Sequence, residues 1–222
     1  MTGGDPHVLV VAKAPVPGLA KTRLGQQVGM TRAADLAAAA LLDTLDACVE
    51  AFGPGHRHVA MTGDLAAAVR RDELDAALHG WRVFEQRGTT FGERLAHAHA
   101  DLGAAPVVQI GMDTPHVTGD LLSSAGALLD DHDAVLGPAE DGGWWLLALR
   151  DPAAAVVLRH VPMSTPETAA LTRAALEAGG LDVGETVARR DVDEVADAGV
   201  VAAGARHTRF AAAWLVADLA VR

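Results

Sequence analysis

The stretch HVLVVAKAPVPGLAKTRL, residues 7–24, decides how this chain folds and where its function lies. It contains an apolar run, residues 8–11, that predicts a buried strand. Two prolines and a glycine then stiffen and bend the following loop, which carries Lys13, Lys21 and Arg23. Ligands of α/β sheets bind at the carboxyl ends of the strands. The cations and free backbone N–H groups there therefore predict a polyphosphate site.

This loop matches no standard nucleotide-binding fingerprint. Residues 18–22, GLAKT, lack the GxxxxGK[ST] spacing of a Walker A loop, and no GxGxxG follows the first strand. The alternative is a surface loop with solvated side chains. We favour a ligand site, because two prolines and a glycine shaping a loop with three cations are unusual for a simple turn.

The acidic balance of the chain sets this basic loop apart. The 222 residues include 29 Asp and Glu against 18 Lys and Arg, for a formal net charge of -11. Such a charge argues against non-specific nucleic-acid binding, because phosphates would be repelled. It is compatible with a small anionic ligand, since local cations and a metal ion reverse the field inside a cleft. We therefore expect no nucleic-acid partner.

Length and hydropathy favour a cytoplasmic protein with a single domain, residues 1–222. Half of the residues are hydrophobic, enough for a sizeable core. The one cysteine, Cys48, lies in an apolar helical stretch and is predicted to be buried. No signal peptide is recognised, and no apolar run reaches the roughly 18 residues that span a membrane. We expect no membrane partner, and a monomer or a homodimer.

Strand-like and helix-like segments alternate along the chain. Strands are predicted at residues 7–11, 58–62, 81–86, 107–111, 134–136, 144–149 and 181–189. Helices are predicted at residues 33–52, 65–78, 91–102, 119–129, 166–178, 195–203 and 208–221. The last helix is apolar along one face, which favours core packing over a dimer contact. Ser164 and Glu167 match a capping box with Pro166 in the first turn. The alternation predicts a largely parallel sheet covered by helices on both faces.

A carboxylate follows the apolar strand at residues 107–110, where the chain reads GMDTP at 111–115. An Asp at the carboxyl end of a strand, held by a proline turn, is well placed to bind a hard cation such as Mg²⁺ or Mn²⁺. The alternative is that Asp113 caps the next helix or supports the turn. Thr118 is better placed as that cap, so we favour a metal ligand.

The segment GPAEDGGWW, residues 137–145, is a candidate acceptor region. Gly142 and Gly143 allow a backbone to approach a ligand closely and to offer N–H groups. Glu140 and Asp141 are able to take a proton or to orient an acceptor hydroxyl. An Asp-Gly hairpin turn is an alternative that is compatible with this role. The two adjacent tryptophans would point to opposite faces of a strand, one into the core and one toward the pocket.

The segment DVD places two alternate carboxylates, Asp191 and Asp193, on one side of an extended chain. Metal ligation explains this pair, and an ordinary acidic loop is the alternative. Two or three carboxylates around Mg²⁺ would form a normal diphosphate site. The ten histidines show no zinc-site spacing, and no GxSxG motif of a serine nucleophile occurs.

Together these motifs resemble a family of bacterial transferases, the radical-SAM/selenodomain-associated transferase 1 family. That family is a former domain of unknown function, is also labelled TIGR-type glycosyltransferase, and belongs to the nucleotide-diphospho-sugar transferase (GT-A) superfamily. The likeness spans about residues 7–215. It is carried by AKAPVPGLAKTRL (12–24), QRGTTFGERL (86–95), GMDTP (111–115), GPAEDGGWWLL (137–147), STPET (164–168) and DVD (191–193). The run KTRL is also similar to the 2-phospholactate or phosphoenolpyruvate guanylyltransferases.

The resemblance implies a three-layer α/β/α sandwich of the GT-A type that uses a nucleotide donor and a divalent metal, Mg²⁺ or Mn²⁺. It implies donor contacts by Ala12, Lys13, Pro15, Gly18, Lys21, Thr22, Arg23, Gln86 and Arg94. It implies acceptor contacts by Glu140, Asp141, Gly142, Gly143, Trp144 and Ser164. It implies metal ligation by Asp113, Asp191 and Asp193, and catalytic roles for Lys21, Arg23 and Asp113. The chain departs from the family at Met163, where a Trp is common, and at Trp144, where a Tyr is usual. Both positions lie on the implied acceptor side.

Two enzymatic functions would use these parts. In nucleotidyl transfer, a phosphorylated or carboxylated acceptor attacks the α-phosphate of an NTP and pyrophosphate leaves. In glycosyl transfer, a sugar moves from a nucleotide sugar to a small acceptor and the nucleoside diphosphate leaves. Both need charge neutralisation of a leaving diphosphate. The triple-cation loop favours a triphosphate, so nucleotidyl transfer is the first prediction, glycosyl transfer the second and a non-catalytic nucleotide-binding module the third.

Overall fold

A seven-stranded sheet lies at the centre of the computed structural model, which describes residues 5–219. Its order is β3-β2-β1-β4-β6-β5-β7. The strands are β1 His7–Lys13, β2 Arg57–Thr62, β3 Arg82–Glu85, β4 Val107–Gly111, β5 Ala134–Pro138, β6 Trp144–Leu149 and β7 Val183–Glu185. Only the two pairings made by β6 are antiparallel among these strands. The prediction of a largely parallel sheet is confirmed.

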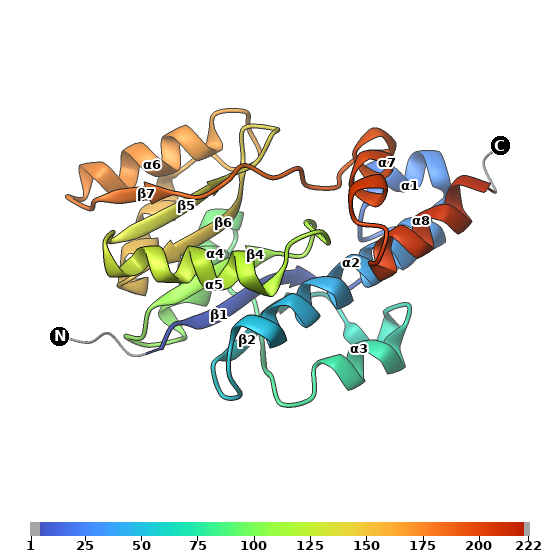
Figure 1. Ribbon diagram of the computed structural model, residues 1–222, viewed down its shortest axis with the longest axis horizontal. Helices are drawn as coiled ribbons and strands as arrows, with labels where there is room; N and C mark the ends of the chain where they lie inside the picture. Colours follow the sequence, from blue (N-terminus) through green and yellow to red (C-terminus); the bar gives the residue numbers. More distant parts are fainter. Residues whose placement is uncertain (1–4, 220–222) are drawn as a thin grey trace.

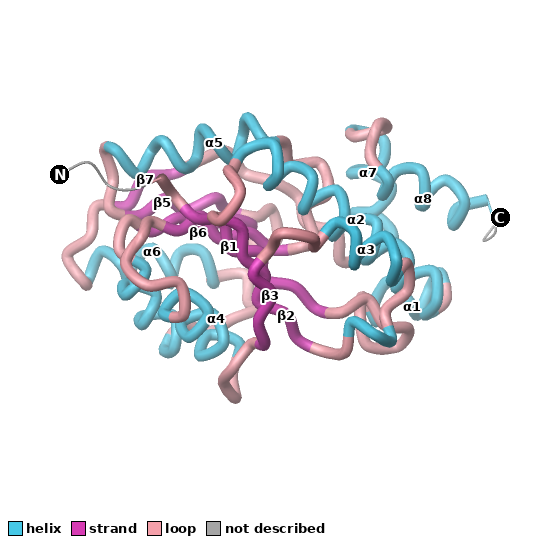
Figure 2. The backbone as a smooth tube through the Cα atoms, turned by 90° about the horizontal axis from the view of Figure 1, so that it is seen from below, coloured by secondary structure: helices cyan, strands magenta, loops and turns pink. Residues whose placement is uncertain are grey.

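Helices cover both faces of this sheet. The α-helices are α1 Thr22–Val28, α2 Met30–Ala51, α3 Arg71–Ala77, α4 Phe91–Ala100, α5 Gly119–Ala127, α6 Thr168–Ala178, α7 Val195–Gly204 and α8 Arg209–Leu219. Short 3₁₀ helices are η1 Leu65–Ala67, η2 Leu128–Asp130 and η3 Pro152–His160. Figure 2 shows α2 and α5 on one side of the strands and α4 and α6 on the other. The implied three-layer sandwich is therefore confirmed.

The alternation of side chains along the strands builds two separate cores. Val8 of β1 is buried with Leu41 of α2 on one face. Leu9, the next residue of β1, is buried with Leu95 of α4 and Leu158 of η3 on the other face. The two cores fix the sheet between its helical layers and leave its carboxyl edge free for a site.

A third core lies beside the sheet, in a group of helices that we call the side lobe: α1, the first half of α2, α7 and α8 (Figure 1). Leu24 of α1, Leu36 of α2 and Phe210 of α8 are fully or almost fully buried there. Val192, which precedes α7, is buried in the same core. The prediction that the closing helix packs one face into a core is thus confirmed for Phe210, Ala211 and Trp214, whereas Leu215 and Val216 are exposed. Residues 220–221 of the predicted helix lie outside the described residues. Among residues 5–219, no helix combines the length and apolarity that a bilayer crossing needs.

Several predicted boundaries are wrong. The predicted helix 65–78 is interrupted, because Ala68 is extended and Arg70 has a left-handed φ of 52° between η1 and α3. The predicted helix 33–52 begins earlier, at Met30, and α1 and η3 were not predicted. The predicted strand 181–189 shrinks to the three residues of β7.

The predicted capping box at Ser164 is also wrong. Ser164 has a left-handed φ of 60°, and α6 begins only at Thr168, after Glu167, whose side chain makes no capping hydrogen bond. Instead, the Thr168 hydroxyl accepts from the Thr165 N–H and donates to the Pro162 carbonyl, each at 3.0 Å. This hydroxyl secures the turn that replaces the predicted first helical turn.

Two histidines are buried in uncharged form. His99 on α4 is fully buried, and its Nε2 lies 2.8 Å from Oε1 of Gln109. Burial lowers the pKa of His99 to about 4. His58 on β2 stacks on His7, and burial together with the His7 charge lowers its pKa to about 4. Both pKa values lie well below the ordinary histidine value of 6.5.

We expect the free energy of unfolding to fall as the pH drops from about 6.5 toward about 4. In this window the unfolded chain binds protons at His58 and His99 while the folded chain does not, so stability rises with pH. Each histidine contributes a slope of up to about 1.4 kcal/mol per pH unit. Urea unfolding at several pH values measures this slope. A His99→Gln variant should have a shallower slope, and an unchanged slope would contradict the assignment.

Candidate functional site

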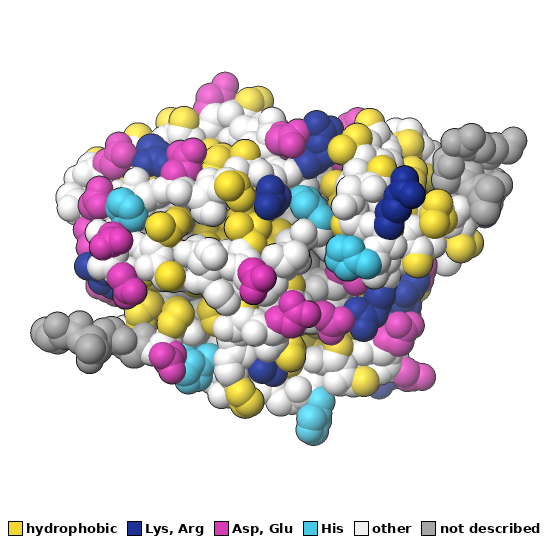
Figure 3. Space-filling model, viewed as in Figure 1, with side chains coloured by type: hydrophobic (Ala, Val, Ile, Leu, Met, Phe, Trp, Pro, Cys, Tyr) yellow, Lys and Arg dark blue, Asp and Glu magenta, His cyan; other side chains and the backbone are white. Residues whose placement is uncertain are grey.

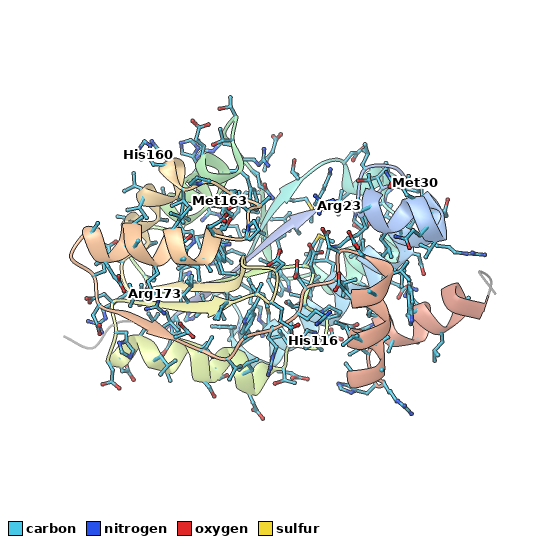
Figure 4. The ribbon with its side chains drawn as sticks, turned by 90° about the horizontal axis from the view of Figure 1, so that it is seen from above. Arg23, Met30, His116, His160, Met163 and Arg173 are labelled. Carbon is cyan, nitrogen blue, oxygen red and sulfur yellow. The ribbon has the colours of Figure 1, made fainter. Side chains whose placement is uncertain are left out.

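A cavity of about 630 Å³ lies at the carboxyl ends of β1 and β4. Figure 4 labels two of its lining residues, Arg23 on α1 and Met163 on the loop after η3. Most predicted site residues line it: Ala12, Lys13, Lys21, Thr22, Arg23, Gln86, Arg94, Asp113, Asp141, Gly143, Trp144, Ser164, Asp191 and Asp193. Four others are not among its lining residues: Pro15, Gly18, Glu140 and Gly142. The structure thus gathers most of the predicted site around one cavity.

Lys21 connects three segments at this cavity. Its Nζ lies 2.9 Å from Oδ2 of Asp113 and 3.7 Å from Oδ1 of Asp193, and it donates to the carbonyl of Val192. Its backbone is left-handed, with φ 48° and ψ 47°, immediately before α1. The side chain is only 9% exposed. The ammonium therefore fixes the loop after β1 to the loop after β4 and to the segment before α7.

That segment, residues 189–194, crosses the edge of the cavity and is called here the acidic strap. The N–H of Val192 donates to the main-chain carbonyl of Asp113 at 2.9 Å. Arg23 Nη1 lies 2.7 Å from Oδ2 of Asp193. Arg189 forms a β-bridge to Ala139, beyond the end of β5. The strap is thus held to the sheet edge and to the side lobe at once.

Arg190 fastens the strap from its outer side. Its Nη2 lies 2.5 Å from Oε2 of Glu140, and its Nη1 lies 3.2 Å from Oδ1 of Asp197 on α7. Glu140 and Arg190 line a smaller, mostly acidic cavity of about 320 Å³ beside the first. Glu140 is therefore an ion-pair partner of the strap in this structure.

The carboxylates around the strap lie close enough to influence one another. Burial raises the pKa of Asp191 to about 6, and the charges of Asp141 and Asp113 act in the same direction, opposed by Lys21. Oδ1 of Asp113 is buried without a hydrogen-bond partner. Residues 5–219 contain no group of three His, Cys, Asp or Glu side chains arranged to hold a metal ion. The metal-ligand role of Asp113, Asp191 and Asp193 stays a prediction.

Two cations of the cavity, Lys13 and Arg94, have no carboxylate partner within the described part of the chain. The Arg94 guanidinium lies 5.4 Å from the ring centre of Phe91, and its Nε is buried without a hydrogen-bond partner. The neighbouring Glu93 instead completes a capping box with Thr90, and hydrogen bonds from Thr89 and Thr90 lower its pKa to about 2. Arg94 is therefore available to a ligand, whereas Glu93 fixes the start of α4.

Gln86 has a structural task at the cavity wall. Its Nε2 donates to the carbonyls of Ala12 at 2.8 Å and Ala60 at 2.9 Å. This amide therefore ties the chain beyond β3 to β1 and β2.

The two tryptophans of β6 point to opposite faces of the sheet, as predicted. Trp145 packs in the core under α2 and donates to the Val187 carbonyl at 3.0 Å. Trp144 packs on the α6 side and donates to the Thr172 hydroxyl at 3.2 Å. Both border the cavity. The predicted turn between β5 and β6 is confirmed, because Oδ1 of Asp141 accepts from the Gly143 N–H at 2.8 Å.

Gly142 is required for packing at this turn. Its φ is 89°, and a Cβ there would lie 2.0 Å from the carbonyl oxygen of Pro166. Its own carbonyl accepts from the N–H of Ala169 at 2.9 Å. The glycine thus lets the turn dock directly against the start of α6.

We expect Gly142→Ala to lower the free energy of unfolding by about 2–5 kcal/mol, the sum of a left-handed backbone penalty and an overpacking penalty. Urea unfolding measures the change. Gly103→Ala is the matched control, because Gly103 has a similar φ of 83° with nothing within 4 Å of its Cβ position. Equal losses in the two variants would contradict a packing role for Gly142.

Sequence reasoning gave no role to some residues that line the main cavity or the smaller one beside it. Gln109 interrupts the apolar run of β4 and lines the cavity, and a buried amide in such a strand is a usable signal. Arg190, a cation directly before DVD, offered a similar clue. Thr114 also lines the cavity; it lies inside the GMDTP motif, but no role of its own was assigned to it from the sequence. Met163, which the resemblance placed on the acceptor side, lines the cavity as well.

Comparisons with known proteins agree with this architecture. A family model described as an uncharacterized protein conserved in bacteria (DUF2064) matches residues 44–165. A candidate nucleotide-diphospho-sugar transferase from Desulfovibrio desulfuricans G20 is 28% identical, with a TM-score of 0.84, over 98% of this chain and 97% of that one. A search among curated proteins found no match.

Two more distant structures share the fold. CMP:2-keto-3-deoxy-manno-octonic acid synthetase, solved with CTP, is 14% identical with a TM-score of 0.57, over 92% of this chain and all of that one. Rv0371c from Mycobacterium tuberculosis H37Rv, solved with manganese, is 19% identical with a TM-score of 0.51, over 88% of this chain and 97% of that one. The resemblance to the radical-SAM-associated transferases stays a prediction.

Proposed function

This chain belongs to the DUF2064 family of uncharacterized proteins conserved in bacteria, and we propose that it is a metal-dependent transferase with a nucleotide donor. One observation carries the proposal: Lys13, Lys21, Arg23 and Arg94 line a single cavity at the carboxyl edge of the sheet, beside Asp113. The likeness to the Desulfovibrio protein over nearly the whole chain supports it.

The donor phosphates would bind among these cations. Lys13 and Arg94 are free of carboxylate partners in the described chain, and Arg23 is largely exposed beyond its contact with Asp193. Charge-assisted hydrogen bonds from such groups are the stronger kind and suit a phosphate chain. The phosphate role therefore extends to Lys13 and Arg94 as well as to Lys21 and Arg23.

The carboxylates fit a divalent cation that arrives with the donor. Mg²⁺ in nucleotide sites is held by one or two carboxylates plus phosphate oxygens, so a complete protein cage is unnecessary. The ligands would be Asp113, whose buried Oδ1 has no hydrogen-bond partner, and Asp191, whose pKa is raised in part by the charge of Asp113. A divalent cation bound there supplies charge compensation for the leaving diphosphate. Asp193 is engaged by Arg23 and is the weaker candidate.

We favour nucleotidyl transfer, in which an oxygen of a small phosphorylated or carboxylated acceptor attacks the α-phosphate of an NTP and pyrophosphate leaves. The synthetase of the same fold that was solved with CTP supports this choice. Glycosyl transfer is the second candidate, supported by the name of the Desulfovibrio protein.

The acceptor would bind at the opposite end of the cavity from α1, near Asp141, Trp144 and Ser164. Asp141 is fixed by its hydrogen bond to the turn, so its carboxylate is positioned to orient an acceptor group. Trp144 offers an apolar wall on the same side. The strap covers the cavity edge and would keep water from the reacting phosphate.

Product analysis separates the candidates. The chain is incubated with Mg²⁺, each NTP and a set of phosphorylated or carboxylated acceptors, and pyrophosphate is measured. Release of pyrophosphate that depends on the acceptor supports nucleotidyl transfer. Hydrolysis of one nucleotide sugar without pyrophosphate release supports glycosyl transfer. Tight nucleotide binding with no product in any mixture would leave only a binding module.

A further inference from the structure

We infer that Lys21 is a built-in competitor of divalent cations for Asp113 and Asp193, so that cation binding depends on an anionic ligand that draws the ammonium away. This rests on the proposed function in one respect, the polyphosphate nature of that ligand. The geometry behind it is independent of the reaction: the ammonium of the largely buried Lys21 side chain lies 2.9 Å from a carboxylate oxygen of Asp113 and 3.7 Å from one of Asp193.

The ammonium makes one hydrogen bond and two ion pairs within the protein. Its three partners are Asp113 Oδ2, Asp193 Oδ1 and the Val192 carbonyl. An ammonium has three donors and no acceptor, and at 3.7 Å the Asp193 oxygen is held by charge attraction and not by a hydrogen bond. Because the Lys21 side chain is only 9% exposed, solvent and salt screen these attractions only weakly.

Asp113 depends on Lys21 more than Asp193 does. Lys21 is the only Lys or Arg within ion-pair distance of Asp113 in the described residues, whereas Asp193 also pairs with Arg23 at 2.7 Å. Removal of the ammonium would leave Asp113 beside Asp191 and Asp193 without local compensation. A divalent cation, which prefers carboxylate oxygens, would then take the place of the lost charge.

The same contacts explain how an anionic ligand would draw Lys21 away from Asp113 and so allow a divalent cation to bind. A polyphosphate entering beside Lys13 and Arg94 brings several negative charges close to Lys21. The ammonium would move its hydrogen bonds from carboxylate to phosphate, because charge-assisted bonds to phosphate are comparably strong. The freed Oδ2 of Asp113, together with its unpartnered Oδ1, would then be open to a cation. Ligand and cation would bind with positive coupling.

The test measures Mn²⁺ affinity by the electron paramagnetic resonance signal of free Mn²⁺, with no turnover involved. We expect Lys21→Met to bind Mn²⁺ at least tenfold more tightly than the unchanged protein. Lys13→Met is the matched control, because it removes the same charge from the same cavity without touching a carboxylate. An equal gain in both variants, or no gain in Lys21→Met, would overturn the inference.

A second measurement uses the unchanged protein and so does not depend on the folding of a variant. Inorganic tripolyphosphate should tighten Mn²⁺ binding to the protein at least tenfold after correction for chelation in solution. Unchanged affinity would overturn the coupling. If the chain binds no nucleotide while Lys21→Met still gains Mn²⁺ affinity, the proposed function fails and this inference stands.

Discussion

Replacing Asp113 by Asn is expected to lower nucleotide-dependent turnover by at least about a hundredfold, the scale seen when a group that stabilises developing charge is removed. The substitution keeps the shape of the side chain and removes its charge. It leaves intact the hydrogen bond from Val192 to the main-chain carbonyl of Asp113, so the strap should stay in place. Pyrophosphate release at saturating NTP and a series of Mg²⁺ concentrations measures the loss.

The expected loss has a second signature. Because the carboxylate is proposed to hold the cation, the Mg²⁺ concentration needed for half-maximal rate should rise in the variant. Asp131→Asn, an exposed Asp beside η2, is the control for a general effect of one lost charge. Full metal-dependent activity in Asp113→Asn would remove Asp113 from the metal site.

Replacing Phe210 by Ala is expected to lower the free energy of unfolding by about 3–5 kcal/mol, the usual penalty for deleting a buried aromatic side chain. Phe210 on α8 is 1% exposed and belongs to the core of the side lobe with Leu24 and Leu36. That core also contains Val192 of the acidic strap. The variant should therefore lose stability and also weaken nucleotide binding, since the strap loses its anchor.

Urea unfolding and nucleotide titration of the same sample measure both effects. Val216→Ala is the control, because Val216 lies on the same helix and is 71% exposed. It should change the free energy of unfolding by less than about 0.5 kcal/mol. If Phe210→Ala lowers the free energy of unfolding by less than about 1 kcal/mol, the proposed role of Phe210 in the side-lobe core is wrong. If the variant shows the full loss of stability but binds nucleotide as tightly as the unchanged protein, the side-lobe core does not support the site through the strap.

The strands were the most predictable part of the fold, because short apolar runs bounded by turn residues carry a strong local signal. β1, β4 and β6 appear within two residues of their predicted ends. The helix at α1 was not predicted, since its N-cap is Lys21 in a left-handed conformation and no capping residue marks its start. The error at Ser164 has the opposite cause: a capping signal is present, and the docking of Pro166 against Gly142 overrides it.

The kinds of residue that form the site could be predicted from the sequence, but which of them contact one another could not. Motifs 171 residues apart, such as Lys21 and Val192, meet only through the sheet order and the side-lobe core. Local sequence patterns carry no information on contacts between residues so far apart in the chain, so the ion pair of Lys21 with Asp113 could not be derived from them. The same holds for Arg190, whose partner Glu140 lies on another loop.

The most direct test of a nucleotide site is the melting temperature of the protein with each NTP, NDP and common nucleotide sugar, measured with and without Mg²⁺. A ligand at about 100 times its dissociation constant adds about 2.7 kcal/mol to the free energy of unfolding. For a chain of this length that corresponds to a rise of roughly 5–10 °C. We predict such a rise, dependent on Mg²⁺, with one NTP. No rise with any nucleotide, with or without Mg²⁺, would contradict the nucleotide site on which the proposed function depends.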